Sequence, residues 1–279
     1  MLKTDTKPRR NFVISGGASH GATLWGSVTA ALSLFSAGGF AGASIGAVIA
    51  AGLALGIDRN LLESELVGLF QKNRLTGGAK LLRFHPRVLW ARGGGLHDWT
   101  HVVAALKRIF GDAKMGDAKV PLHIVVGDVY LGQPRIISSE THPEVLVWQV
   151  LAASTAIAPI ADAQTIPSLG TGNRLYVDGG WGNNVPVSVF AGEPDPSVVI
   201  FLSKSNGPDP EVTKREGVFG VVLACFEMAL YADPDIPARH DDLLLPIVPE
   251  GSGLDFDLSA AEIRKRVLHG AKQAYRGLK

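Results

Sequence analysis

Several features that mark whole classes of protein are absent from this sequence or rare in it. Only one cysteine occurs among the 279 residues, so the chain cannot form an internal disulfide, which fits a reducing compartment. That residue, Cys225, lies in the apolar run VVLACFEMAL, where we expect a buried and inert thiol. Neither sign of charge is in excess, because 27 lysines and arginines face 26 acidic residues, and a net charge of +1 gives no electrostatic indication of nucleic-acid binding.

Long hydrophobic runs are also scarce, with one exception. The N-terminal stretch MLKTDTKPRR is polar and basic, and the apolar piece FVI after it is too short for a signal peptide, so we expect no Sec signal, although export by another route stays open. The exception is GFAGASIGAVIAAGLALGI, residues 39–57, which is uncharged and about long enough to cross a bilayer. Its glycines and alanines bury little area and no basic cluster flanks it. We therefore expect no transmembrane span, and a cytoplasmic or peripheral membrane location.

Short apolar segments with the character of buried strands alternate with helical patterns along the chain. Such alternation is typical of a mainly parallel sheet with helices on both faces. We therefore expect a three-layer α/β fold and a single domain over residues 1–279, since no repeat or linker interrupts the pattern. Strands are expected at 11–14, 39–41, twice within 121–138, 174–177, 197–203 and 242–248, and helices at 22–37, 47–55, 61–70, 102–110, 142–154, 219–231 and 259–278.

The pattern fades between residues 71 and 96. Paired and triple glycines and a proline interrupt it, and apolar side chains such as Trp90 alternate with basic ones. Long irregular insertions of this kind are usually functional or mobile, and mixed apolar and basic residues suit a membrane surface. We expect either a lid at about 71–96 with transient membrane contact, or an ordinary loop whose apolar residues join the core.

The exceptional run 39–57 also contains GASIG, in which Ser44 lies between Gly42 and Gly46. A nucleophilic serine must project from a sharp turn between a strand and a helix, and glycines two residues before and after it remove the Cβ atoms that would collide. The context fits, because a helix is expected after Ser44 and its N-terminal amides favour a developing negative charge. The alternative is a glycine-rich buried helix in which the serine has no function.

Two further glycine-rich segments accompany that serine. SGGASHG, residues 15–21, follows the first expected strand and opens a helix, with a spacing that is neither that of a dinucleotide-binding loop nor that of a P-loop. DGG, which begins at Asp178, follows the expected strand RLYV and by itself is a common turn signal. An aspartate at the carboxyl end of a strand is nevertheless well placed to reach a site at that edge of an α/β sheet.

Taken together and in this order, the three segments resemble those of the patatin-like phospholipases. Further blocks extend the resemblance over most of the chain, namely GGGLHDWTHVVAALKRIFGD, PLHIVVGDVYLGQPRII, AASTAIAPI and DGGWGNNVPV. The resemblance implies a lipid acyl hydrolase of the phospholipase A, lysophospholipase or esterase type that uses a Ser–Asp dyad and an acyl-enzyme. It also implies that no metal or cofactor is needed, and the sequence has no His-Glu-x-x-His or Cys-x-x-Cys spacing.

Carried over by position, the resemblance assigns a role to five residues. Ser44 would be the nucleophile and Asp178 the general base. The backbone amides of Gly17 and Ala18 would form the oxyanion hole, and Gly16 would allow the turn before them. The substrate would be a phospholipid or another acyl ester.

The segment SGGASHG, residues 15–21, is called the glycine loop below, and it departs from the family pattern at two positions. The family usually has glycine at the position of Ala18, and arginine or lysine at the position of His20. Because histidine can be neutral near pH 7, His20 does not provide a fixed positive charge. These departures keep open a catalytically weak or inactive lipid-binding or scaffold protein on the same fold. A second alternative is a Ser-His-Asp triad, since His240 and His269 both follow Asp178 in the order typical of α/β-hydrolases.

Overall fold

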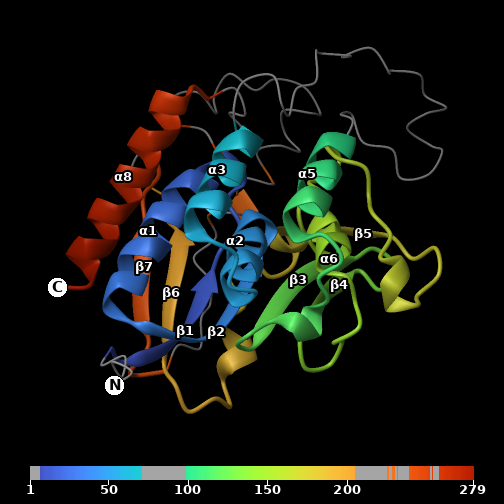
Figure 1. The fold of residues 1–279 in the computed structure, drawn as a ribbon, viewed down its shortest axis with the longest axis horizontal. Helices are drawn as coiled ribbons and strands as arrows, with labels where there is room; N and C mark the ends of the chain where they lie inside the picture. The colour runs from blue at the N-terminus through green and yellow to red at the C-terminus, as the bar shows by residue number, and fades with distance from the viewer. Residues whose placement is uncertain are drawn as a thin grey trace.

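The computed structural model describes most of the chain. Figure 1 shows its elements, coloured from blue at the N-terminus to red at the C-terminus. The expected insert at 71–96 and most of the expected helix at 219–231 lie outside the described residues. The described residues are 7–70, 99–204, 239–251 and 258–279, and the single positions Cys225, Met228, Ala229, Tyr231 and Gly253.

In this part of the chain, one mixed sheet of seven strands has the order β4-β3-β2-β1-β6-β7, with β5 also paired to β3. The strands β3, β2, β1, β6 and β7 are parallel, whereas β4 and β5 run antiparallel to β3. This arrangement confirms the expected three-layer α/β fold with a mainly parallel sheet. The strands are β1 (Arg9–Ile14), β2 (Ser36–Ala43), β3 (Leu122–Asp128), β4 (Gln133–Ser138), β5 (Tyr176–Asp178), β6 (Ser197–Leu202) and β7 (Leu243–Ile247).

The helices follow the expected order but differ at some ends. Helix α1 ends at Leu34 and not at residue 37, because Ser36 already pairs with Arg9 as the first residue of β2. Gly38 and Gly39 lie in β2, where a Cβ on Gly39 would lie 2.9 Å from the ring of Phe190. The helices are α1 (Gly21–Leu34), α2 (Ser44–Ala54), α3 (Arg59–Phe70), α5 (Thr100–Phe110), α6 (Val147–Ser154) and α8 (Ala260–Gly277).

Helices α5 and α6 also begin differently from the expectation. Helix α6 starts at Val147 and not at the expected residue 142, because the N–H of Val145 closes a turn onto the carbonyl of His142. Helix α5 starts at Thr100, two residues before the expected residue 102, and Trp99 occupies the capping position without a side-chain hydrogen bond.

Residues 39–57 form the end of β2, a turn and then α2 (Figure 1). The run of small apolar residues is therefore explained by burial between the sheet and its helices. None of the helices in the described part of the chain combines the length and the apolar character that a membrane span requires.

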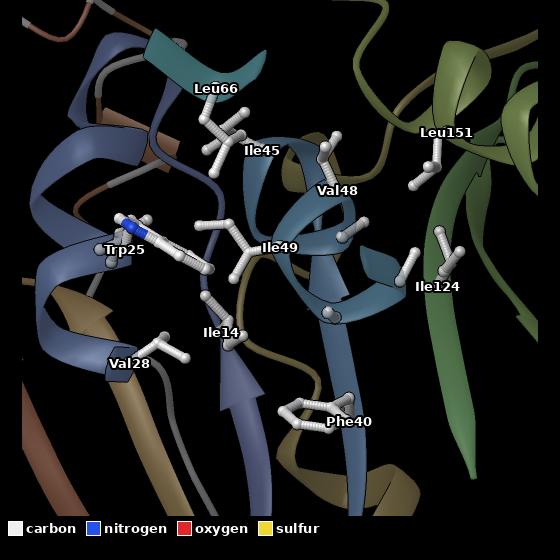
Figure 2. Packing of buried hydrophobic residues seen from close by; sticks show 14 of the residues in the cluster. Ile14, Trp25, Val28, Phe40, Ile45, Val48, Ile49, Leu66, Ile124 and Leu151 are labelled. Carbon is white, nitrogen blue, oxygen red and sulfur yellow. The ribbon is translucent and has the colours of Figure 1, made fainter. Parts of the chain in front are cut away.

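Alternate residues of the central strand β1 enter two cores on opposite faces of the sheet. Ile14 belongs to the larger core, where Trp25 of α1 and Ile49 of α2 meet above it (Figure 2). Val13 belongs to the smaller core, which includes Phe190 of the short 3₁₀ helix η5 (Val187–Phe190). Successive side chains of this strand point to opposite faces of the sheet and therefore belong to two different cores.

Helix α8 packs against α1 with direct backbone contact. A Cβ on Gly26 would lie 1.9 Å from the carbonyl oxygen of Val267, and one on Gly270 would lie 1.9 Å from that of Thr23, so only glycine permits this approach. The last helix of the chain is thereby held beside the first one (Figure 1).

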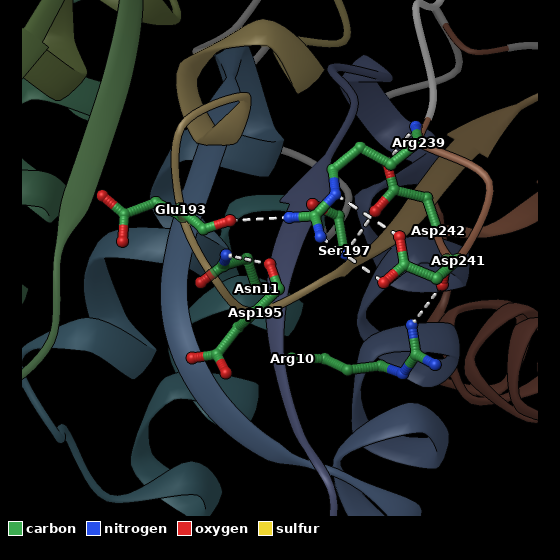
Figure 3. A network of polar contacts seen from close by, with 8 residues as sticks. All are labelled: Arg10, Asn11, Glu193, Asp195, Ser197, Arg239, Asp241 and Asp242. Atoms are coloured by element: carbon green, nitrogen blue, oxygen red, sulfur yellow. Dashed lines mark hydrogen bonds and ion pairs between the residues drawn. The ribbon is translucent and has the colours of Figure 1, made fainter.

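A polar network joins the amino ends of β1 and β6 to the segment before β7 (Figure 3). The Asn11 side chain donates to the carbonyl of Asp195 over 2.9 Å, and the N–H of Ser197 donates to the Asp242 carboxylate over 2.6 Å. These bonds hold the amino ends of the strands in place relative to one another.

The cysteine does not behave as expected. Cys225 is exposed, which corrects the prediction of a buried thiol. Met228, three residues further on, is also exposed, at 61%. An apolar run in the sequence therefore does not determine which of its side chains contact the core.

Candidate active site

Strands β2 and β5 meet end to end along one edge of β3. The last residue of β2, Ala43, pairs with Val125, and the last residue of β5, Asp178, pairs with the adjacent Val126. Since β2 runs parallel to β3 and β5 antiparallel, the two strands point toward each other. The residue that follows β2, Ser44, therefore meets Asp178, and its Oγ donates a hydrogen bond to Oδ2 of that carboxylate over 2.6 Å.

The turn at Ser44 has the strain that the glycine spacing predicts. Ser44 has a φ of +52°, in the left-handed region that side chains other than glycine rarely adopt. A Cβ on Gly42 would lie 2.6 Å from the backbone of Gly46, and one on Gly46 would lie 2.3 Å from the carbonyl oxygen of Ser15. Both glycines are therefore required for the turn, as expected from the sequence.

A second serine supports this turn from α6. The N–H of Ser44 donates to Oγ of Ser154 over 2.9 Å, and Ser154 in turn donates to the carbonyl of Val125 over 2.7 Å. Ser154 thereby joins α6, the strand β3 and the start of α2. The block AASTAIAPI contains this residue, but its pattern does not indicate that the hydroxyl would contact the Ser44 backbone.

The Asp178 carboxyl is fully buried. Its Oδ1 accepts the N–H of Gly180 over 2.7 Å, while Oδ2 accepts the Ser44 hydroxyl. Desolvation raises the pKa of Asp178 to about 7, against the opposing effect of these two hydrogen bonds. The group therefore exchanges a proton near neutral pH. Gly179 is needed beside it, because a Cβ there would lie 2.3 Å from the carbonyl oxygen of Val125.

The glycine loop passes directly above the serine. A Cβ on Gly16 would lie 2.5 Å from Oδ1 of Asn184 and 3.0 Å from Cβ of Ser44, so only glycine fits. The same Asn184 oxygen accepts the N–H of Gly16 over 2.9 Å, which anchors the loop to the segment after β5. Asn184 belongs to the block DGGWGNNVPV, and its role was not predicted from the sequence.

The hydrogen bonds of the loop leave two amides free within the described residues. The N–H of Ser19 donates to the carbonyl of Gly253, and that of His20 donates to the carbonyl of Gly17. The N–H groups of Gly17 and Ala18 have no acceptor among the described residues. Ala18 itself has a φ of +47°, which is a strained conformation for alanine.

His20 is buried beside this loop, in the short 3₁₀ helix η1 (Ala18–His20). Its Nε2 lies 2.7 Å from the hydroxyl of Tyr231. Burial, together with the positive charge of Arg266, lowers the pKa of His20 to about 3. The side chain is therefore neutral at physiological pH, so it does not supply the fixed positive charge that the family pattern has at this position.

A small apolar cavity adjoins the serine. It has a volume of about 40 Å³ and lies between α2, α5 and the end of α6. Ser44 and Ala18 contribute to its wall, and the remaining lining is almost entirely apolar. The other lining residues are Ile45, Val48, Leu69, Trp99, Val102, Leu106, Thr155 and Ile157.

The two histidines that could complete a triad have other surroundings. Nε2 of His269 lies 2.9 Å from the carbonyl of Val248, and its Nδ1 lies 3.4 Å from the Glu250 carboxylate. His240 lies in the turn before β7. No cluster of three or more potential metal ligands is present among the residues that the structure describes.

The sequence and the fold resemble those of known proteins. Residues 12–191 match the family model described as patatin-like phospholipase, and the chain belongs to this family. VipD from Legionella pneumophila has a similar structure, with a TM-score of 0.57 and 13% identity over 96% of this chain and 66% of VipD. The type III effector protein ExoU matches with a TM-score of 0.42 and 13% identity, over 97% of this chain and 53% of ExoU.

These likenesses differ in what they establish. At 13% identity, the similarity to VipD is a similarity of fold. The chain spans about two thirds of the length of VipD and about half of ExoU. Among curated proteins, none is significantly similar to this chain.

Proposed function

We propose that this chain is a lipid acyl hydrolase that cleaves carboxylic esters of phospholipids, lysophospholipids or related acyl esters through Ser44 and Asp178. The observation that carries the proposal is the 2.6 Å hydrogen bond between these two buried side chains, next to an apolar cavity. Membership of the patatin-like phospholipase family supports the substrate class.

The first half of the reaction forms an acyl-enzyme. Ionised Asp178 accepts the proton of the Ser44 hydroxyl as Oγ attacks the ester carbonyl carbon. The carbonyl oxygen becomes an oxyanion, which accepts hydrogen bonds from the free amides of Gly17 and Ala18. The C–O bond to the leaving group then breaks, and the departing alcohol or lysolipid takes the proton from Asp178.

The second half releases the acyl group. Water gives a proton to Asp178 while its oxygen attacks the acyl carbonyl, and the same two amides stabilise the second oxyanion. Collapse of this intermediate returns the proton to Ser44 and frees the fatty acid. A carboxylate with a pKa of about 7 suits both steps, because general bases are most effective when their pKa is near the working pH.

The apolar cavity gives the acyl chain a place next to the nucleophile. Side chains from α2 and α5, including Val48, Val102 and Leu106, line it. Burial of methylene groups against such walls is favourable by about 0.8 kcal/mol each. We propose that the acyl group enters this cavity while the head group stays outside.

The dyad is favoured over a Ser-His-Asp triad by the contacts of the histidines. The Ser44 hydroxyl already donates to a carboxylate, whereas His269 interacts with Val248 and Glu250. The variants His269→Ala and His240→Ala should therefore keep the esterase rate within about threefold of the native rate, whereas a triad member would lose several orders of magnitude.

Hydrolysis of a soluble p-nitrophenyl ester and of phospholipid vesicles tests the proposal. We expect Ser44→Ala and Asp178→Asn each to lower kcat/KM by roughly 10³-fold or more, as for other catalytic residues that act as a unit. Ser33→Ala is the matched control, because that hydroxyl bonds to Tyr275 and to its own helix. A Ser44→Ala protein with native activity would disprove the assignment. A native protein without any hydrolysis would favour the non-catalytic lipid-binding alternative.

We also propose that the chain contacts a membrane surface through the turn between β3 and β4. Three consecutive apolar residues are exposed there, Val129 at 51%, Tyr130 at 78% and Leu131 at 49%. The buried carboxylate of Asp128 holds the turn by accepting the N–H groups of Tyr130 and Leu131, and Arg174 pairs with it over 3.1 Å. A rigid turn that displays apolar and aromatic side chains suits the interfacial region of a bilayer.

Vesicle co-sedimentation tests this contact. The double variant Tyr130→Ser, Leu131→Ser should bind phospholipid vesicles several-fold more weakly than the native protein, with unchanged hydrolysis of the soluble ester. Leu268→Ser is the control, since that leucine is 61% exposed on α8. Equal binding of both variants would refute the contact. A single domain over residues 1–279, with a peripheral membrane location, is part of the same proposal.

A further inference from the structure

An arginine from the last helix reaches the glycine loop. Arg266 of α8 is only 7% exposed, and its Nη1 donates to Oγ of Ser19 over 3.1 Å. Ser19 follows Ala18 directly, and Ala18 carries one of the two free amides. The hydrogen bond to Ser19 therefore joins the last helix of the chain to the loop that carries these amides.

This contact matters because the backbone of Ala18 is strained, with a φ of +47°. A left-handed conformation costs a residue with a Cβ about 1–2 kcal/mol, so Ala18 must be held there by its surroundings. On one side, the N–H of Gly16 is bonded to Asn184. On the other side, the N–H of Ser19 donates to the carbonyl of Gly253, and its hydroxyl accepts a hydrogen bond from Arg266.

These two partners of Ser19, Gly253 and Arg266, come from the C-terminal part of the chain. Gly253 also lies against the loop, since a Cβ on it would lie 3.1 Å from the ring of His20. That ring is neutral and adds no charge, whereas Arg266 is charged at all working pH values. Helix α8 is in turn held beside α1, so Arg266 approaches the loop from a fixed support (Figure 1).

We propose that Arg266 is a positioning residue for the oxyanion hole. Acting through Ser19, it keeps Ala18 in its left-handed conformation, so that the amides of Gly17 and Ala18 point to the same acceptor. This inference rests on the proposed function. It extends the active site to a helix beyond residues 12–191, which match the family model.

Steady-state kinetics on a soluble ester test the role. Arg266→Met should lower kcat by roughly 10-fold to 100-fold, because misaligning one of two oxyanion donors costs part of the 10²–10³-fold effect of removing one. KM should change by less than about threefold, because substrate binding in the apolar cavity does not use the arginine. Arg266→Lys should recover part of kcat, since an ammonium can still donate to Ser19.

Lys265→Met is the matched control on the same helix. The Lys265 side chain is 71% exposed and its partner is the exposed Glu250, so its loss should leave kcat unchanged. Thermal unfolding of each variant separates a change in kcat from a loss of folded protein. If Arg266→Met does not fold, Ser19→Ala removes the same contact from the other side and should show the same loss of kcat with unchanged KM.

A double-mutant cycle distinguishes positioning from a direct effect of charge. Glycine adopts positive φ without strain, so in an Ala18→Gly background the loop needs less support. The loss of kcat caused by Arg266→Met should therefore be several-fold smaller in that background. An equal loss in both backgrounds, or kcat values for Arg266→Met and Ser19→Ala equal to that of Lys265→Met, would overturn the inference.

Failure of this inference differs from failure of the proposed function. If Ser44→Ala abolishes hydrolysis while Arg266→Met resembles Lys265→Met, the dyad stands and the role of Arg266 is wrong. If Ser44→Ala retains activity, the dyad is wrong, and with it the oxyanion hole that Arg266 would support.

Discussion

The raised pKa of the buried Asp178 carboxyl predicts how the free energy of unfolding depends on pH, as well as how activity does. Its pKa rises from 3.8 to about 7 on folding because burial removes water from the charged form. Between these two pH values the folded protein holds a proton that the unfolded chain has lost. The unfolded state then binds fewer protons, so the free energy of unfolding falls as the pH rises through this window and becomes constant above it.

The expected magnitude follows from the size of the shift. About three pH units at 1.36 kcal/mol each correspond to roughly 4 kcal/mol of stability lost between pH 4 and pH 8. An asparagine side chain has almost the same shape as the aspartate but no charge to desolvate. The variant Asp178→Asn should therefore gain stability relative to the native protein as the pH rises, by up to about 4 kcal/mol at pH 8.

Urea unfolding of both proteins at pH 4.5, 6 and 8 measures this difference. All other titrating groups are common to the two proteins, so their contributions cancel in the comparison. The same variant should be almost inactive, which would make Asp178 a residue that serves activity at the expense of stability. A stability difference that does not change with pH would refute the reasoning, since Asp178 would then ionise near its ordinary pKa.

Four further predictions concern the reaction, the turn and the cavity. The kcat/KM for a soluble ester should rise with pH and level off above about 7, as ionised Asp178 becomes fully populated. Ser154→Ala should lower the unfolding free energy by about 1–3 kcal/mol and also lower kcat, because it leaves two buried backbone groups unpaired. Gly46→Ala should prevent stable folding by circular dichroism, whereas Gly192→Ala, with open space around the new methyl, should not. Val102→Phe should fill the cavity and reduce kcat/KM for long acyl chains more than for acetyl esters.

Local patterns predicted the parts of the site that depend on local sterics. The glycines at positions 42 and 46 indicate a crowded turn, and the structure has close backbone contacts at both. The alternation of strands and helices likewise predicts the three-layer α/β fold, because the spacing of apolar residues in each element reflects which of its faces is buried. The predicted end of α1 was wrong because strand pairing of Ser36 with Arg9 overrides the helical pattern.

The meeting of Ser44 and Asp178 could not be derived from either segment alone. Asp178 lies at the carboxyl end of its strand, as expected, but β5 runs antiparallel to β3 and reaches the serine from the direction opposite to β2. Only the family resemblance connected the two residues. Strand direction in a three-residue strand is set by pairing with β3, and its local sequence carries no sign of it.

The supporting residues were missed because their signal is long-range. Ser154 and Asn184 lie in blocks that carry the family resemblance, but a serine or asparagine that bonds to a distant backbone group has no local pattern. Arginines on an amphipathic final helix usually lie on its solvated face, so the local sequence gives no sign that Arg266 is buried. It is buried because Gly26 and Gly270 let α8 approach α1 closely, which the sequence of α8 by itself does not predict.

The central claim is that the hydroxyl of Ser44 is a nucleophile activated by Asp178. Intact-mass analysis after reaction with a fluorophosphonate probe tests it most directly. We predict one label per native chain, mapped to Ser44 by peptide analysis, no label in Ser44→Ala and much slower labelling in Asp178→Asn. A native protein that stays unlabelled, or a label on another residue that persists in Ser44→Ala, would contradict the account.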